Sequence, residues 1–99
     1  MQKKGYEFLL PEDFDDEALI LESKGWARVV LALDIGLKYS LTFIDPARLS
    51  QDVDDELISQ GYYFESNLVV VSAITRQNIE TVVVKIIESK IYEAMKHEP

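Results

Sequence analysis

The chain has 99 residues, 47% of them hydrophobic, which is the length of a single globular domain with enough apolar material for a core. It contains no cysteine and one histidine, so we expect no disulfide bond, iron–sulfur cluster, thiolate zinc site or Ser-His-Asp triad. The net charge is −8, and both halves of the chain are acidic, which argues against nucleic acid and anionic membranes as partners.

No apolar run reaches the roughly 18–20 residues that a transmembrane helix needs. The N-terminal segment contains Lys3 and Lys4, but no apolar stretch follows them, so we expect no signal peptide. Together with the absence of cysteine, these features favour a cytoplasmic protein.

The N-terminal quarter combines a predicted strand with an acidic loop. Residues 5–10 form a short apolar run that Pro11 ends, which predicts a strand. Residues 12–17 are too charged for an interior strand, and we expect a loop there with Phe14 turned inward. Residues 18–22 fit either a strand or a helix, and the turn signal at residues 23–25 favours the strand.

The clearest hairpin pattern covers residues 26–34 and 37–44. In its second arm Tyr39, Leu41 and Phe43 alternate with polar residues, which is the period of two of a half-buried strand. Both faces of the first arm are apolar, so we expect that strand to be central in the sheet. Gly36 supplies a positive φ at the connection if the turn needs one.

A helix is predicted for about residues 46–60. Asp45 and Pro46 are a typical N-cap and first helical residue, and Gly61 is a typical left-handed C-cap. Between them three aliphatic residues recur every four positions and form an apolar stripe: Leu49, Val53 and Leu57.

The C-terminal third predicts a strand over residues 68–74, a tight turn and the longest helix, about residues 76–95. Thr75 is the expected N-cap of this helix. Its apolar stripe is interrupted at Lys90, and three residues beyond Lys90 are displaced around the helix: Ile91, Tyr92 and Met95. Those three residues either wrap the edge of the sheet or reach a second subunit.

The order of elements predicts an α+β fold. We expect a two-layer sandwich with a mostly antiparallel sheet of four or five strands and both helices on one face. Residues 39–74 have the size of a strand–helix–strand crossover.

Two acidic clusters are candidates for a binding surface. The first contains Glu12, Asp13, Asp15, Asp16 and Glu17, and the second contains Asp52, Asp54, Asp55 and Glu56. Neither fits a calcium-binding EF-hand loop, because the glycine and final glutamate positions hold other residues. The remaining interpretations are a solvated face, a surface for a basic protein partner, or a site for a hard cation.

An aromatic run follows Gly61 and consists of Tyr62, Tyr63 and Phe64. It fits core packing with one tyrosine at the rim, or an anchor in a protein interface, where tyrosine and tryptophan are enriched. Trp26 has the same two interpretations, core packing or an anchor in a protein interface.

Signals for catalysis are few. Asp34, Asp45 and Arg48 lie near the ends of the hairpin, and one possibility is that they share a cleft. No phosphate-binding glycine motif or nucleophile elbow is present, so we expect neither an enzyme nor a cofactor.

These observations favour a non-enzymatic, acidic protein-binding module, comparable in general character with immunity proteins, antitoxins or secretion chaperones. Its expected partner is a protein with a basic surface. Its expected binding residues are the second acidic cluster, the two tyrosines and most of the first cluster: Asp52, Asp54, Asp55, Glu56, Tyr62, Tyr63, Asp13, Asp15, Asp16 and Glu17. One alternative is a structural or regulatory homodimer whose interface contains Ile91, Tyr92 and Met95. Another is a small enzyme or ligand-binding domain that uses carboxylates and tyrosines.

Overall fold

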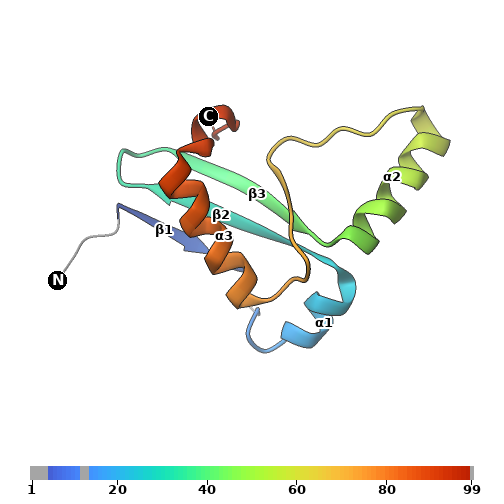
Figure 1. Ribbon diagram of the computed structural model, residues 1–99, viewed down its shortest axis with the longest axis horizontal. Coiled ribbons are helices and arrows are strands. Elements are labelled where there is room, and N and C mark those ends of the chain that lie inside the picture. Colours follow the sequence, from blue (N-terminus) through green and yellow to red (C-terminus); the bar gives the residue numbers. More distant parts are fainter. Residues whose placement is uncertain (1–4, 12–13, 99) are drawn as a thin grey trace.

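A computed structural model describes residues 5–11 and 14–98 of the chain. The elements follow in the order β1 (Tyr6–Leu9), α1 (Ala18–Lys24), β2 (Trp26–Leu33), β3 (Lys38–Ile44), α2 (Pro46–Gln60), β4 (Leu68–Val70), α3 (Arg76–Ser89) and a short 3-10 helix, η1 (Ile91–Ala94). The described residues thus form an α+β fold with a four-stranded, mixed but mostly antiparallel sheet and three α-helices, which confirms the predicted fold class (Figure 1).

The strands lie in the sheet in their sequence order, β1-β2-β3-β4. The first two pairs are antiparallel and the last is parallel. Trp26 lies opposite Ile44 and Ala32 opposite Lys38, which confirms the predicted hairpin and the central position of β2. Gly36, with φ of 93°, sits in the connecting turn.

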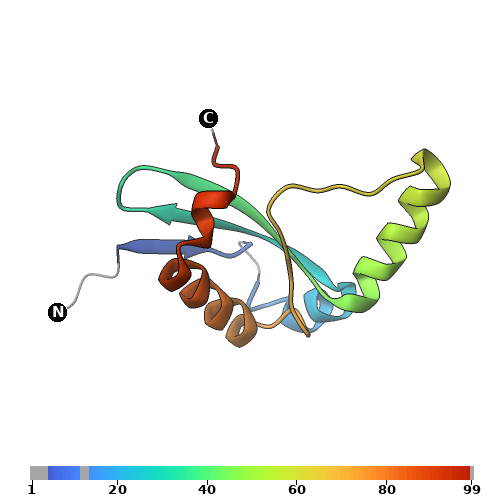
Figure 2. The ribbon, with the colours of Figure 1, turned by 45° about the horizontal axis from the view of Figure 1, so that its top comes forward.

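The core lies between α3 and one face of the sheet (Figure 2). The predicted alternation in β3 holds only in part, because Thr42, which was expected on the polar face, is also buried. The residues predicted to face inward, Tyr39, Leu41 and Phe43, are all buried. Their partners across the strand pair, the buried Leu31, Val29 and Ala27, share this face. The helix and the connecting segments complete the core with Phe14, Val71, Ile74, Ile79, Val83 and Ile86.

The strand prediction for residues 18–22 is wrong, because these residues form helix α1. A short, continuous apolar run carries no periodicity that separates the two structures. The turn signal at residues 23–25 is the end of this helix, where Gly25 adopts the left-handed conformation with φ of 86°. Helix α1 buries little apolar surface, since Leu19 is 82% exposed and Ile20 is 62% exposed.

Gly25 also joins α1 to the start of α2. The Asp45 backbone N–H donates a hydrogen bond of 2.9 Å to the Gly25 carbonyl. A Cβ atom on Gly25 would lie 2.8 Å from the Arg48 Cβ, so the close approach excludes a side chain as much as the positive φ does.

Two C-terminal boundaries differ from the prediction. Strand β4 ends at Val70 instead of residue 74, because Val70 is already paired with Ile44, the last residue of β3. Helix α3 ends at Ser89 instead of about residue 95, because Lys90 adopts a left-handed conformation with φ of 58°. The predicted cap of this helix is confirmed, since the Thr75 hydroxyl accepts the Asn78 N–H at 3.2 Å.

Helix α2 has its predicted bounds but not the expected packing against the sheet face. None of its residues is buried, and it projects beyond the end of the sheet (Figures 1 and 2). The molecule is therefore elongated, with extents of 50 × 30 × 22 Å. We call α2 together with residues 61–66, the segment that returns toward β4, the arm.

Candidate functional site

The start and end of the arm are set by local sequence signals. Asp45 accepts the Arg48 N–H at 2.7 Å as the N-cap of α2, and Pro46 occupies the first turn. At the other end Gly61 adopts φ of 86° and its N–H closes the helix on Glu56 and Leu57 carbonyls. The chain then turns back toward the sheet and diverges from α2 (Figure 1), with residues 63–65 facing the helix across a gap.

The helix and the returning segment enclose a hollow of about 380 Å³, which we call the arm hollow. It is lined by four carboxylates and two aromatic rings: Asp52, Asp55, Glu56, Glu65, Tyr63 and Phe64. Three acidic residues of the second predicted cluster and one predicted tyrosine therefore converge. The sequence interpretation missed Glu65, although it directly follows the aromatic run.

Two predicted binding residues of the arm lie outside this hollow. Asp54 is exposed on α2 and does not line it. Tyr62 is 59% exposed and is also absent from the lining.

Tyr63 is the polar centre of the arm hollow. Its hydroxyl oxygen is buried and has no hydrogen-bond partner among the described residues. Burial raises the pKa of the Tyr63 phenol above its ordinary value of 10.0, and the nearby carboxylates Glu65, Asp52 and Glu56 raise it further. The raised pKa therefore keeps the Tyr63 phenol uncharged beside the carboxylates of the hollow.

The acidic charge of the hollow is only partly compensated within the arm. The Arg48 Nε atom lies 2.9 Å from an Asp52 oxygen, and both side chains are about one-third exposed. Glu56 accepts a hydrogen bond from the Gln60 amide, which carries no charge. Phe64 adds an apolar ring that is 77% exposed beside these carboxylates.

The first acidic cluster is a different environment. Glu12 and Asp13 lie outside the described residues. Asp15 is paired with Arg76 at the start of α3, whose Nε and Nη2 atoms lie within 3.1 Å of its oxygens. Arg76 also lies 5.9 Å from the centre of the Phe14 ring. Asp16 and Glu17 are exposed, and Glu17 makes no side-chain cap hydrogen bond to α1.

The three residues predicted for an oligomer interface are divided. Tyr92 and Met95 pack against the hydrophobic core, and the Tyr92 ring meets Tyr39 edge-on with centres 6.1 Å apart. Ile91 is 52% exposed. Trp26 is half-buried in β2, with the Lys24 ammonium 4.6 Å from its ring centre.

The possibility that Asp34, Asp45 and Arg48 share one cleft holds only for the last two, since Asp45 and Arg48 line a small hollow of about 130 Å³ and Asp34 lies elsewhere. Asp34 follows β2 at the turn of the hairpin, whereas Asp45 follows β3 at its open end, beside Trp26. Asp45 is used as a helix cap. Over residues 5–11 and 14–98, no group of three or more histidine or acidic side chains has an arrangement that could hold a metal ion.

Comparison of the chain with protein-family models, with curated proteins and with solved structures found no match. No helix in the described part of the chain is long and apolar enough to cross a bilayer.

Proposed function

We propose that this protein is a non-enzymatic binding module, and that its arm docks on a basic surface of another protein. The single observation that supports this most is the arm hollow, where four carboxylates and two aromatic rings converge on an element that buries none of its own helix residues. An element that contributes so little to the core is available for recognition. We further propose a cytoplasmic location.

The chemistry of the arm suits a lysine- or arginine-rich partner. Carboxylates accept charge-assisted hydrogen bonds from these side chains, and an aromatic face attracts the same cations. Phe64 offers an exposed apolar anchor at the rim of the hollow. The net charge of −8 would also accelerate the encounter with a basic surface, most strongly at low ionic strength.

The test is capture of a partner from a native lysate of the source organism by the tagged, intact chain. We expect a stoichiometric basic protein whose binding weakens as salt is added. Replacing the four carboxylates of the hollow by their amides (Asp52→Asn, Asp55→Asn, Glu56→Gln and Glu65→Gln) should weaken binding of that protein about tenfold or more, because these groups are the proposed contacts.

A matched control removes the same number of charges outside the arm and outside the first acidic cluster, at four exposed positions: Glu7→Gln, Glu22→Gln, Glu88→Gln and Glu93→Gln. Both variants have the same net charge, so long-range steering changes equally in the two. Equal losses of binding in the arm variant and the control, or unchanged binding in the arm variant, would refute the arm as the docking surface.

A further inference from the structure

The C-terminal residues run beside β3 at the end of the sheet where β4 begins. Strand β4 pairs only with residues 42–44 of β3, so the first half of β3 has no neighbouring strand on that side. Residues 96–98, which we call the strap, run past this open edge. The Glu98 N–H donates to the Lys38 carbonyl at 2.7 Å.

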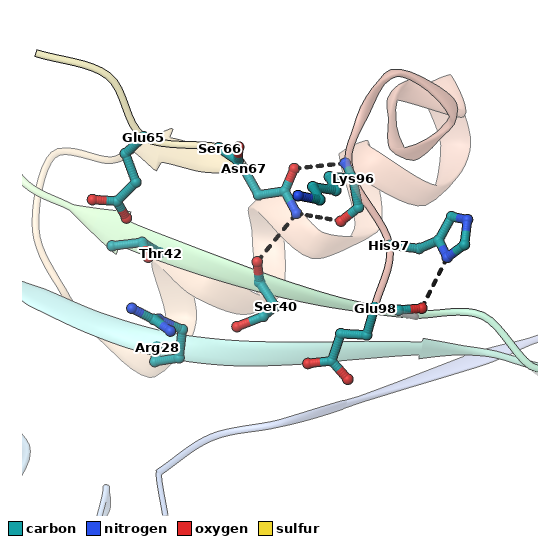
Figure 3. Close-up of a pocket in the computed structure, with 9 residues that line it drawn as sticks. All are labelled: Arg28, Ser40, Thr42, Glu65, Ser66, Asn67, Lys96, His97 and Glu98. Atoms are coloured by element: carbon teal, nitrogen blue, oxygen red, sulfur yellow. Dashed lines mark hydrogen bonds between the residues drawn. The ribbon is translucent and has the colours of Figure 1, made fainter.

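Asn67 connects the strap to the sheet (Figure 3). Its Oδ1 accepts the Lys96 N–H at 2.9 Å, and its Nδ2 donates to the Lys96 carbonyl at 2.6 Å. The same Nδ2 donates to the Ser40 carbonyl of β3 at 3.2 Å. One side-chain amide thus satisfies the backbone of the strap and of β3 together, as a peptide group of a further strand would.

The backbone of Asn67 has a separate role. Its φ of 57° lies in the left-handed region, which asparagine tolerates better than most residues. Its carbonyl accepts the Thr42 N–H at 3.1 Å, directly before β4. The conformation of the backbone therefore starts the parallel strand pair, while the side chain holds the strap.

Apolar packing contributes little to holding the strap. All three of its residues are exposed, and a hollow of about 350 Å³ separates part of it from Arg28, Ser40 and Thr42 (Figure 3). The His97 ring meets Tyr39 edge-on, with centres 6.1 Å apart. Hydrogen bonds to a few groups are easily exchanged for water, so such a contact can open without unfolding the core.

Asn67 also marks the point where the arm rejoins the body. No backbone hydrogen bond to the sheet is made by residues 62–66, and the first one after α2 is accepted by the Asn67 carbonyl. We propose that the Asn67 amide is a latch that fixes the strap to the edge of β3, and that the strap in turn steadies the returning segment of the arm. The latch does not depend on what the arm binds.

The test separates the two roles of Asn67. Asn67→Gly keeps the left-handed backbone accessible and removes the amide. Amide hydrogen exchange, followed by NMR at mildly acidic pH, should become about tenfold faster or more at Lys96 and Glu98, because their partners are lost or loosened. Thr42 should keep its protection, since its acceptor is the backbone carbonyl.

Two further variants complete the experiment. Asn67→Asp keeps an acceptor for the Lys96 N–H but places a carboxylate oxygen against the Lys96 and Ser40 carbonyl oxygens, so it should loosen the strap at least as much as Asn67→Gly. Asn78→Ala removes a side-chain amide that bonds Ala73 at the start of α3, and it should leave the strap unchanged.

The second half of the test removes the strap and measures the effect on the arm. A chain that ends at Met95 lacks the strap, and residues 64–66 should then show lower heteronuclear NOE values, with the signals of Val29 and Leu41 unaltered. Unchanged exchange at Lys96 in Asn67→Gly would overturn the latch. Unchanged NOE values at residues 64–66 in the shortened chain would overturn its effect on the arm.

Discussion

At the scale of single residues, Tyr63 has the most unusual environment. An unpaired hydroxyl that is shielded from water loses hydrogen bonds that it would have in the unfolded chain. The three carboxylates around it add a second cost, which applies only to the ionised phenolate. These two effects lead to different predictions for neutral and for alkaline pH.

Tyr63→Phe should leave the free energy of unfolding at neutral pH unchanged or raise it by about 1 kcal/mol, because the ring remains and the unpaired hydroxyl is removed. In the wild type the raised pKa keeps the phenol neutral in the folded state. The associated stability is fully present below pH 10.0, the ordinary pKa, and is lost as the pH rises through the raised value. Tyr63→Phe should lack this alkaline loss.

Ultraviolet titration of the five tyrosines, combined with urea unfolding at several alkaline pH values, measures both effects. The latest phenolate step should disappear in Tyr63→Phe. Tyr62→Phe is the matched control, since Tyr62 is 59% exposed and its removal should leave that step in place. A late step that survives in Tyr63→Phe would mean that another tyrosine is the shielded one.

At the scale of elements, α2 and α3 differ although both are amphipathic and carry a confirmed N-cap and a left-handed C-cap. The apolar stripe of α3 is buried against the sheet, with Ile79 and Val83 fully inaccessible. In the corresponding stripe of α2 no residue is fully buried and Leu57 is 49% exposed, and Ile58 on the outer side is 86% exposed. We therefore expect substitutions on the exposed side of α2 to have little effect on the free energy of unfolding.

Ile79→Ala should lower the free energy of unfolding by about 2–5 kcal/mol, because it leaves a cavity in the core. Ile58→Ala should change it by less than about 0.5 kcal/mol, since the side chain is already in water and alanine favours helix. Urea unfolding measures the free energy of unfolding of the two variants, which carry the same change from isoleucine to alanine. A comparable loss in Ile58→Ala would show that α2 packs against the body in solution.

The sequence predicts a boundary well when adjacent residues set it, and poorly when another element sets it. The predicted bounds of about residues 46–60 agree with helix α2, because Asp45, Pro46 and Gly61 are local signals that operate through the adjacent backbone. The true end of β4 depends on where β3 ends, and the end of α3 depends on the conformation of Lys90. Helix α1 was misassigned because its apolar run has no period and its terminal glycine resembles a hairpin turn.

The candidate site was predictable in part for the same reason. The cluster at residues 52–56 is visible as composition, and three of its acids do line the arm hollow. The chain turns back after Gly61 and brings Glu65 and Phe64 to these acids. No residue spacing in the sequence predicts that reversal. The Asn67 amide was equally hidden, because its partners are 27 and 29 residues away along the chain.

At the scale of the whole molecule, the excess of acidic charge is the dominant property. The net charge is −8, and two ion pairs are found across the described residues, Arg48 with Asp52 and Arg76 with Asp15. Folding brings like charges closer together than they are in the expanded chain, so the excess opposes the folded state. Exposed pairs of this kind contribute only about 0–1 kcal/mol each.

The melting temperature should therefore rise when sodium chloride is increased from about 0.02 to about 0.2 M, because the screening length falls to roughly 8 Å or less and repulsion across the molecule is weakened. Screening also weakens the two ion pairs, but their contribution is smaller than the relief of repulsion. For a domain of this size each 1 kcal/mol corresponds to about 4–8 °C, which calorimetry resolves easily. The double variant Asp54→Asn, Asp55→Asn reduces the net charge at two exposed positions and should show a smaller rise. A melting temperature that falls with salt would mean that specific ion pairs outweigh the general repulsion.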